Sequence, residues 1–114
     1  MTTPTQPVLC LVRDLLFYSK IRSAAAGVEL KSVRDASKLI DEVGVALLVD
    51  LNQDGALQAA IAWRARTSRP VVGFVSHVDG ETIKAARAAG IDRVLARSQF
   101  EQSLPGIFSE LGKP

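Results

Sequence analysis

Residues 44–55 read Gly-Val-Ala-Leu-Leu-Val-Asp-Leu-Asn-Gln-Asp-Gly, and the class of the fold follows from them. Five consecutive apolar residues between a glycine and a polar, glycine-containing turn predict a strand that is covered on both faces of a sheet. Asp50 stands where this strand emerges from the sheet. Ligands and chemistry gather at the carboxyl ends of strands in open α/β sheets. Asp50 therefore predicts a functional site, while a helix cap or the start of a turn is the alternative.

Predicted strands and helices alternate five times along the rest of the chain. The strands are expected at 8–12, 28–33, 45–49, 71–76 and 93–96, and the helices at 14–26, 35–43, 54–69, 79–90 and 98–111. Asp35 or Ser37 and Asp79 are expected to cap two of these helices, Asp54 to precede a third, and Pro105 to break the last one. Five such units predict an α/β, flavodoxin-like single domain, 1–114, with a loose stretch at 1–7. Its five-stranded parallel sheet is expected in the order 2-1-3-4-5, with helices on both faces.

The bulk properties of the chain exclude several classes of function. A chain of 114 residues with 47% hydrophobic and 23% charged residues is ordinary for one globular domain. A net charge of +2 is too small to indicate nucleic-acid binding. The apolar runs are shorter than a membrane span, and no signal peptide is visible. The single cysteine, Cys10, lies in an apolar strand and predicts a buried thiol in a reducing, cytoplasmic compartment.

Four short segments at the predicted strand ends resemble a known family. Residues 8–14, 48–52, 75–76 and 95–98 are similar to the signature positions of response-regulator receiver domains, which are CheY-like. The resemblance covers nearly the whole chain. It implies that Asp50 occupies the phosphoacceptor position and that Ser76 reaches the phosphoryl oxygens. It also implies that Asp14, Asp50 and the main-chain carbonyl of Asn52 would hold Mg²⁺.

Two arginines depart from the pattern of that family. Arg13 stands where the family has a first acidic residue, and Arg97 stands where it has a lysine. A cation at the first position opposes Mg²⁺, and a guanidinium lacks the compact geometry of an ammonium. Arg97 is expected to pair with Asp50 or Asp14 and to stand in place of the metal. The hypothesis favours Asp50 as the partner, so Asp50→Asn should lower stability and barely change metal affinity.

These residues predict a stand-alone pseudo-receiver, a non-enzymatic signalling module that acts through protein contacts. Its phosphorylation switch is expected to be weakened or lost, and no cofactor is expected. One alternative is a working receiver that uses Asp50 and Mg²⁺. Another is a small-molecule-binding or enzymatic domain that uses the same crevice. In the family, partners bind the surface of helix four, strand five and helix five, which here includes Lys84, Arg87, Arg93 and residues 99–110. A homodimer through an apolar part of the last helix is a further alternative.

Other candidate chemistry has little support in the sequence. His77 is the only histidine, and a lone histidine is more often a surface residue than a catalyst. With one histidine and one cysteine, the chain cannot assemble an ordinary zinc cluster. The glycines form neither a dinucleotide-binding fingerprint nor a phosphate-binding loop.

Overall fold

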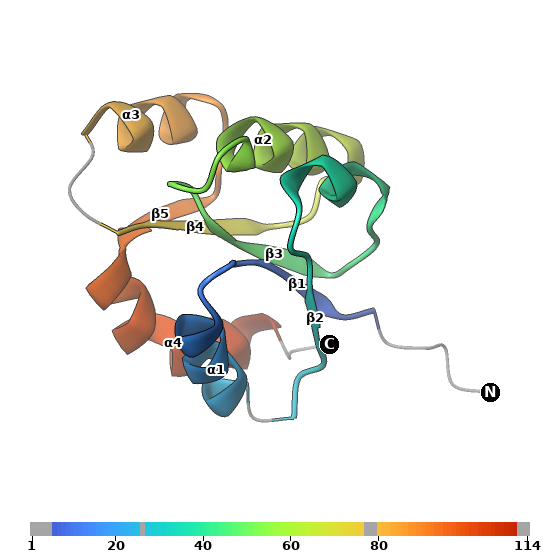
Figure 1. Ribbon diagram of the computed structural model, residues 1–114, viewed down its shortest axis with the longest axis vertical. Helices are drawn as coiled ribbons and strands as arrows, with labels where there is room; N and C mark the ends of the chain where they lie inside the picture. Colours follow the sequence, from blue (N-terminus) through green and yellow to red (C-terminus); the bar gives the residue numbers. More distant parts are fainter. Residues whose placement is uncertain (1–5, 26, 77–79, 112–114) are drawn as a thin grey trace.

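The computed structural model describes residues 6–25, 27–76 and 80–111. A single parallel sheet runs through the centre of the molecule in the order β2-β1-β3-β4-β5, which confirms the predicted topology (Figure 1). Its strands are β1 (Val8–Leu11), β2 (Leu30–Ser32), β3 (Ala46–Asp50), β4 (Val71–Val75) and β5 (Arg93–Ala96). The central strands β1, β3 and β4 are buried on both faces, as expected from their continuous apolar runs.

Helices cover both faces of this sheet. They are α1 (Leu15–Ala24), the 3₁₀ helix η1 (Ala36–Asp41), α2 (Ala56–Thr67), α3 (Gly80–Ala88) and α4 (Arg97–Leu111). Figure 1 shows η1, α2 and α3 on one face and α1 with α4 on the other. This three-layer arrangement is the predicted flavodoxin-like α/β architecture. No described helix is long and apolar enough to cross a membrane.

Each face of the sheet has its own hydrophobic core. Trp63 of α2 is fully buried on one face, and its indole N–H donates a 3.0 Å hydrogen bond to the carbonyl oxygen of Glu42. Three phenylalanines, Phe17, Phe74 and Phe100, form the centre of the other core. Cys10 lies in that second core, where burial raises the pKa of its thiol to about 12. The thiol is therefore a small packing group, as predicted.

The second predicted helix is a single 3₁₀ segment rather than an α-helix. Asp35 caps η1, because its carboxylate accepts a 3.0 Å hydrogen bond from the Ser37 N–H. The chain turns to extended backbone at Glu42, so only six residues remain for the helix, a length typical of 3₁₀ structure. Strand β2 is also shorter than predicted. It pairs only with β1, and its three residues are half-buried or exposed.

The later helices agree with one prediction and correct another. Asp54 precedes α2 as expected, and Gly55, in the left-handed region at φ 74°, occupies the N-cap, where no described side chain caps the helix. Helix α4 runs without a break through Pro105. A proline removes one helical hydrogen bond, but Leu104 and Ile107 on either side are buried and hold the helix against the core. The expected cap Asp79 lies outside the described residues, as does His77.

Candidate functional site at the strand ends

The fold brings the predicted site positions to one edge of the sheet. Asp50 ends β3, Ser76 directly follows β4, Arg97 directly follows β5, and Asp14 comes three residues after β1. Because all strands are parallel, these four positions share the carboxyl edge. The side chains at this edge are held by an ion pair, a cation–π contact and hydrogen bonds to the backbone.

The main ion pair at this edge joins Arg97 to Asp14. Arg97 Nη2 donates to Asp14 Oδ2 at 2.9 Å. The exposed fractions of the two side chains are 36% and 42%, so solvent screens the attraction. One of the two predicted arginine partners, Asp14, is therefore the one observed. No ion pair joins Asp50 to an arginine among the described residues, so the favoured pairing of Asp50 was wrong.

An aromatic cluster fixes the position of the Arg97 side chain. Its guanidinium carbon lies 4.1 Å from the ring centroid of Phe17, in cation–π geometry. Phe17 in turn packs on Phe74 and Phe100 at centroid distances of 5.0 and 6.0 Å. Arg97 begins α4 and Asp14 precedes α1, so the salt bridge joins the starts of two helices on the same face. The cation is therefore held by packing as well as by charge.

Asp14 is also the N-cap of α1. Its Oδ1 accepts hydrogen bonds from the backbone N–H groups of Leu16 and Phe17 at 3.0 and 3.1 Å. The Phe17 N–H is the largest cause that lowers the pKa of Asp14, followed by the hydrogen bond from Arg97. Both oxygens of this carboxylate thus have donors. The position of Asp14 just before a helix was a signal for capping that was available in the sequence.

Asp50 is half-buried and starts a tight turn. Its Oδ1 accepts a 3.0 Å hydrogen bond from the Asn52 N–H, and its carbonyl accepts one from Gln53 N at 3.2 Å. The sequence alternative that Asp50 begins a turn is thereby confirmed. Burial is the largest influence on its pKa and raises it, while the Asn52 N–H and the charge of Arg97 act in the opposite direction. The charge of Asp14 adds to the rise.

Asn52 connects the turn after β3 to the end of β4. Its side-chain Oδ1 accepts a 2.6 Å hydrogen bond from the backbone N–H of Ser76. Its own backbone N–H donates to Asp50, so one residue ties together two of the predicted site positions. The sequence indicated a role for the Asn52 carbonyl and missed the side chain. The one available signal for this side-chain role was that an asparagine amide can hydrogen-bond to a neighbouring loop.

Arg13 lies away from the Asp14–Arg97 pair, toward the loop before η1. It lines a hollow of about 410 Å³ together with Arg34, Asp35 and Asp54. Its charge contributes to lowering the pKa of Asp35, for which the hydrogen bonds from Ser37 are the largest cause. Arg13 is not among the groups that shift the pKa of Asp50. The two arginines that depart from the receiver pattern therefore act in different places.

The carboxylate of Asp14, one of the groups expected to hold Mg²⁺, is already engaged in this structure. Both oxygens of Asp14 accept hydrogen bonds, one from helix amides and one from a guanidinium. The described residues contain no group of three acidic, histidine or cysteine side chains that could hold a metal ion. The guanidinium of Arg97 lies beside the Asp14 carboxylate, where a metal cation would otherwise bind.

Comparisons with solved structures identify the fold. The structure superimposes on that of a response regulator from Hahella chejuensis with a TM-score of 0.80 and 20% identity, covering 94% of this chain and 95% of the other. For the phosphorylated cyanobacterial phytochrome response regulator RcpA, the TM-score is 0.77 and the identity 16%, over 91% of each chain. For the BeF3-activated DrrB receiver domain, the values are 0.80 and 10%, over 97% of this chain and 100% of the other.

These neighbours define the class of fold to which the chain conforms. The chain has the fold of response-regulator receiver domains, as its resemblance predicted. No protein-family model and no curated protein sequence matches it. The low identities fit a chain that keeps the strand order and the strand-end positions while replacing individual side chains.

Proposed function

We propose that the protein is a pseudo-receiver, a signalling module that acts through protein contacts and has lost the phosphorylation switch. The observation that carries this proposal is the salt bridge of Arg97 with Asp14 above the Phe17 ring. Arg97 is a permanent cation, and it already neutralises the carboxylate of Asp14. Such a module does not need Mg²⁺ or a phosphoryl group to hold this part of its structure together. We propose that it acts in the cytoplasm and has no enzymatic activity.

The proposed partner surface lies around β5 and its flanking helices. Lys84 and Arg87 of α3 and Arg93 of β5 are exposed, and none of them forms an ion pair with another described residue. β5 is an edge strand, so its outer side is open to a partner. An acidic partner surface would complement these three cations.

A homodimer through the apolar side of α4 has less support than this surface. The large apolar residues of α4 are buried in the core of one chain, namely Phe100, Leu104, Ile107 and Phe108. They are therefore used for folding and are not free to cover a second copy.

The test is incubation with a small phosphodonor, acetyl phosphate, and Mg²⁺, followed by intact-protein mass spectrometry. The wild type should remain unmodified. The double variant Arg13→Asp with Arg97→Lys restores the two family residues and should acquire a phosphoryl adduct. Addition of Asp50→Asn to the double variant should remove the adduct and so identify Asp50 as the acceptor.

Two outcomes would contradict the proposal. A wild-type adduct that disappears in Asp50→Asn would show a working receiver. An unmodified double variant would show that the two arginines are not the reason for the missing switch. Circular dichroism of each variant should match the wild type, because Arg13 and Arg97 are both on the surface or partly exposed.

A further inference from the structure

A groove lies between η1 and α2, on the opposite face of the sheet from the Arg97–Asp14 pair. Its volume is about 580 Å³, and it does not include Asp14, Asp50 or Arg97. A 3₁₀ helix of six residues spans about 12 Å, whereas an α-helix of twelve residues spans about 18 Å. η1 packs against α2 but is too short to cover its whole flank. The groove is the uncovered part of that flank.

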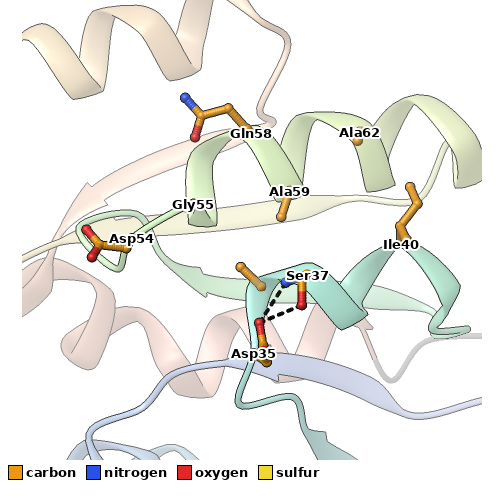
Figure 2. Close-up of a pocket in the computed structure, with 9 residues that line it drawn as sticks. Asp35, Ser37, Ile40, Asp54, Gly55, Gln58, Ala59 and Ala62 are labelled. Carbon is orange, nitrogen blue, oxygen red and sulfur yellow. Dashed lines mark hydrogen bonds between the residues drawn. The ribbon is translucent and has the colours of Figure 1, made fainter.

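The walls of the groove are mainly apolar. Ile40 of η1 points toward α2 and leaves 39% of its surface exposed, while Ala59 and Ala62 of α2 form the facing wall (Figure 2). Ala36 also lines the groove and packs against the core. Because the alanine side chains are short, a side chain from another molecule can enter between the two helices. Covering Ile40 would remove its exposed apolar surface from water and so favour binding.

Two carboxylates stand toward one end of this groove. Asp35 comes from the loop before η1 and Asp54 from the loop before α2, as Figure 2 shows. Asp35 is already engaged, since its Oδ1 accepts both the N–H and the hydroxyl of Ser37 at 3.0 and 2.8 Å. Asp54 is exposed. No described residue donates a hydrogen bond to its carboxylate or forms an ion pair with it.

Among the residues that the structure describes, no cationic side chain lines this groove. Arg13 and Arg34 line an adjoining hollow, which shares Asp35 and Asp54 with it. Even with these arginines nearby, the carboxylate of Asp54 has no ion-pair partner among the described residues. The charge that complements the apolar groove is therefore positive.

We propose that this groove binds a helical segment of a partner protein that presents an aliphatic side chain and a neighbouring lysine or arginine. The aliphatic group would lie between Ile40 and Ala62, and the cation would meet Asp54. The groove is open to solvent along Ile40, Gln58 and Ala62, which suits one face of a helix better than an enclosed small molecule. The inference rests on the proposed function, since it gives the module a second contact surface.

Two synthetic helical peptides of equal length test the proposal. Both carry a leucine stripe, one with flanking lysines and the other with glutamates at the same positions. They are titrated into the full-length, ¹⁵N-labelled protein up to about 1 mM, the range of weak single-segment contacts. The lysine peptide should give saturable amide shifts at Ile40, Ala59 and Ala62, with an affinity at least about tenfold above that of the glutamate peptide. Asp54→Asn should reduce that preference.

A matched pair of variants locates the binding on α2. Ala62→Arg places a long cation in the groove and should abolish the shifts. Ala65→Arg makes the same change one turn further along α2, at an exposed position outside the groove, and should leave them intact. Both alanines are exposed, so both variants are expected to fold, which their amide spectra would verify.

Several results would overturn the groove proposal. They are an absence of shifts, equal binding of the two peptides, or unchanged binding in Ala62→Arg. Concentration-dependent shifts of the same amides without peptide would assign the groove to a second copy of the chain and would also overturn it. None of these results affects the phosphodonor experiment, so failure of this inference and failure of the proposed function are distinguishable.

Discussion

The guanidinium of Arg97 forms a 2.9 Å salt bridge with Asp14 while its central carbon lies 4.1 Å from the Phe17 ring centroid. Phe17 belongs to the helix that Asp14 caps, so one short segment provides both the anion and the ring. Because Asp14 and Phe17 at the start of α1 both hold the Arg97 side chain, its orientation is restricted. This arrangement connects α1 to α4 and occupies the acidic position that the receiver pattern assigns to a metal.

The first prediction concerns the pKa of Asp14. Arg97→Gln should raise it, because a charged donor is lost, yet keep it below the usual value, because the Phe17 N–H is the larger cause and remains. Carboxyl-detected NMR titration measures the change. Lys20→Gln is the control: it removes the Lys20–Glu101 pair between the same two helices without touching Asp14. An unchanged pKa in Arg97→Gln would argue that the salt bridge is absent in solution.

The sign of the pH dependence follows from this lowered pKa. A carboxyl whose pKa is lowered by folding stabilises the folded state above its unfolded pKa, about 3.9. That contribution disappears as the pH falls through the folded pKa. Arg97→Gln should therefore reduce the free energy of unfolding at pH 7 by more than at acidic pH. A loss of equal size at both pH values would mean that Arg97 acts only by packing on Phe17.

The second prediction reverses the one made from sequence for Asp50→Asn. No described arginine pairs with Asp50, and burial raises the pKa of its carboxyl. A raised carboxyl pKa means that stability is lost as the pH rises from the unfolded pKa through the folded pKa. Asparagine removes the buried charge and keeps an oxygen that can accept the Asn52 N–H. The variant should unfold at higher urea than the wild type at pH 7.

The advantage of Asp50→Asn should shrink as the pH falls below the usual carboxyl range, where the wild-type side chain becomes neutral. Parallel urea denaturation at acidic and neutral pH measures this difference. A variant that is less stable than the wild type at pH 7 would instead favour the original hypothesis, in which an arginine depends on Asp50.

The third prediction concerns the continuous helix α4. Pro105 is exposed in its interior, so Pro105→Ala restores a backbone donor without disturbing the core. The free energy of unfolding should rise by about 1–3 kcal/mol, since proline is disfavoured in helix interiors by about 3 kcal/mol and restricts the unfolded chain. Gly106→Ala, where an added Cβ has no neighbour within 4 Å, should add about 0.5–1 kcal/mol. Loss of stability in both variants would indicate that α4 is broken at Pro105.

The sequence predicted the sheet well because its strands are apolar runs that only a doubly covered parallel sheet can bury. The same reasoning placed Asp14, Asp50, Ser76 and Arg97 at one edge. It favoured Asp50 over Asp14 as the partner of Arg97 and was wrong, because the choice depends on the Phe17 ring under the guanidinium, which packs on Phe74 and Phe100. Periodicity likewise cannot separate a short α-helix from η1, since six residues contain fewer than two α-helical turns.

The central claim is that Arg97 stands in place of metal and phosphate at the strand ends. Its most direct test is titration of the ¹⁵N-labelled wild type with beryllium fluoride and Mg²⁺, a mimic of the phosphoryl group, followed at the amides of Asn52 and Ser76. The account predicts no saturable shift at millimolar Mg²⁺. Saturable shifts that require Mg²⁺ and vanish in Asp50→Ala would contradict it and identify a working receiver.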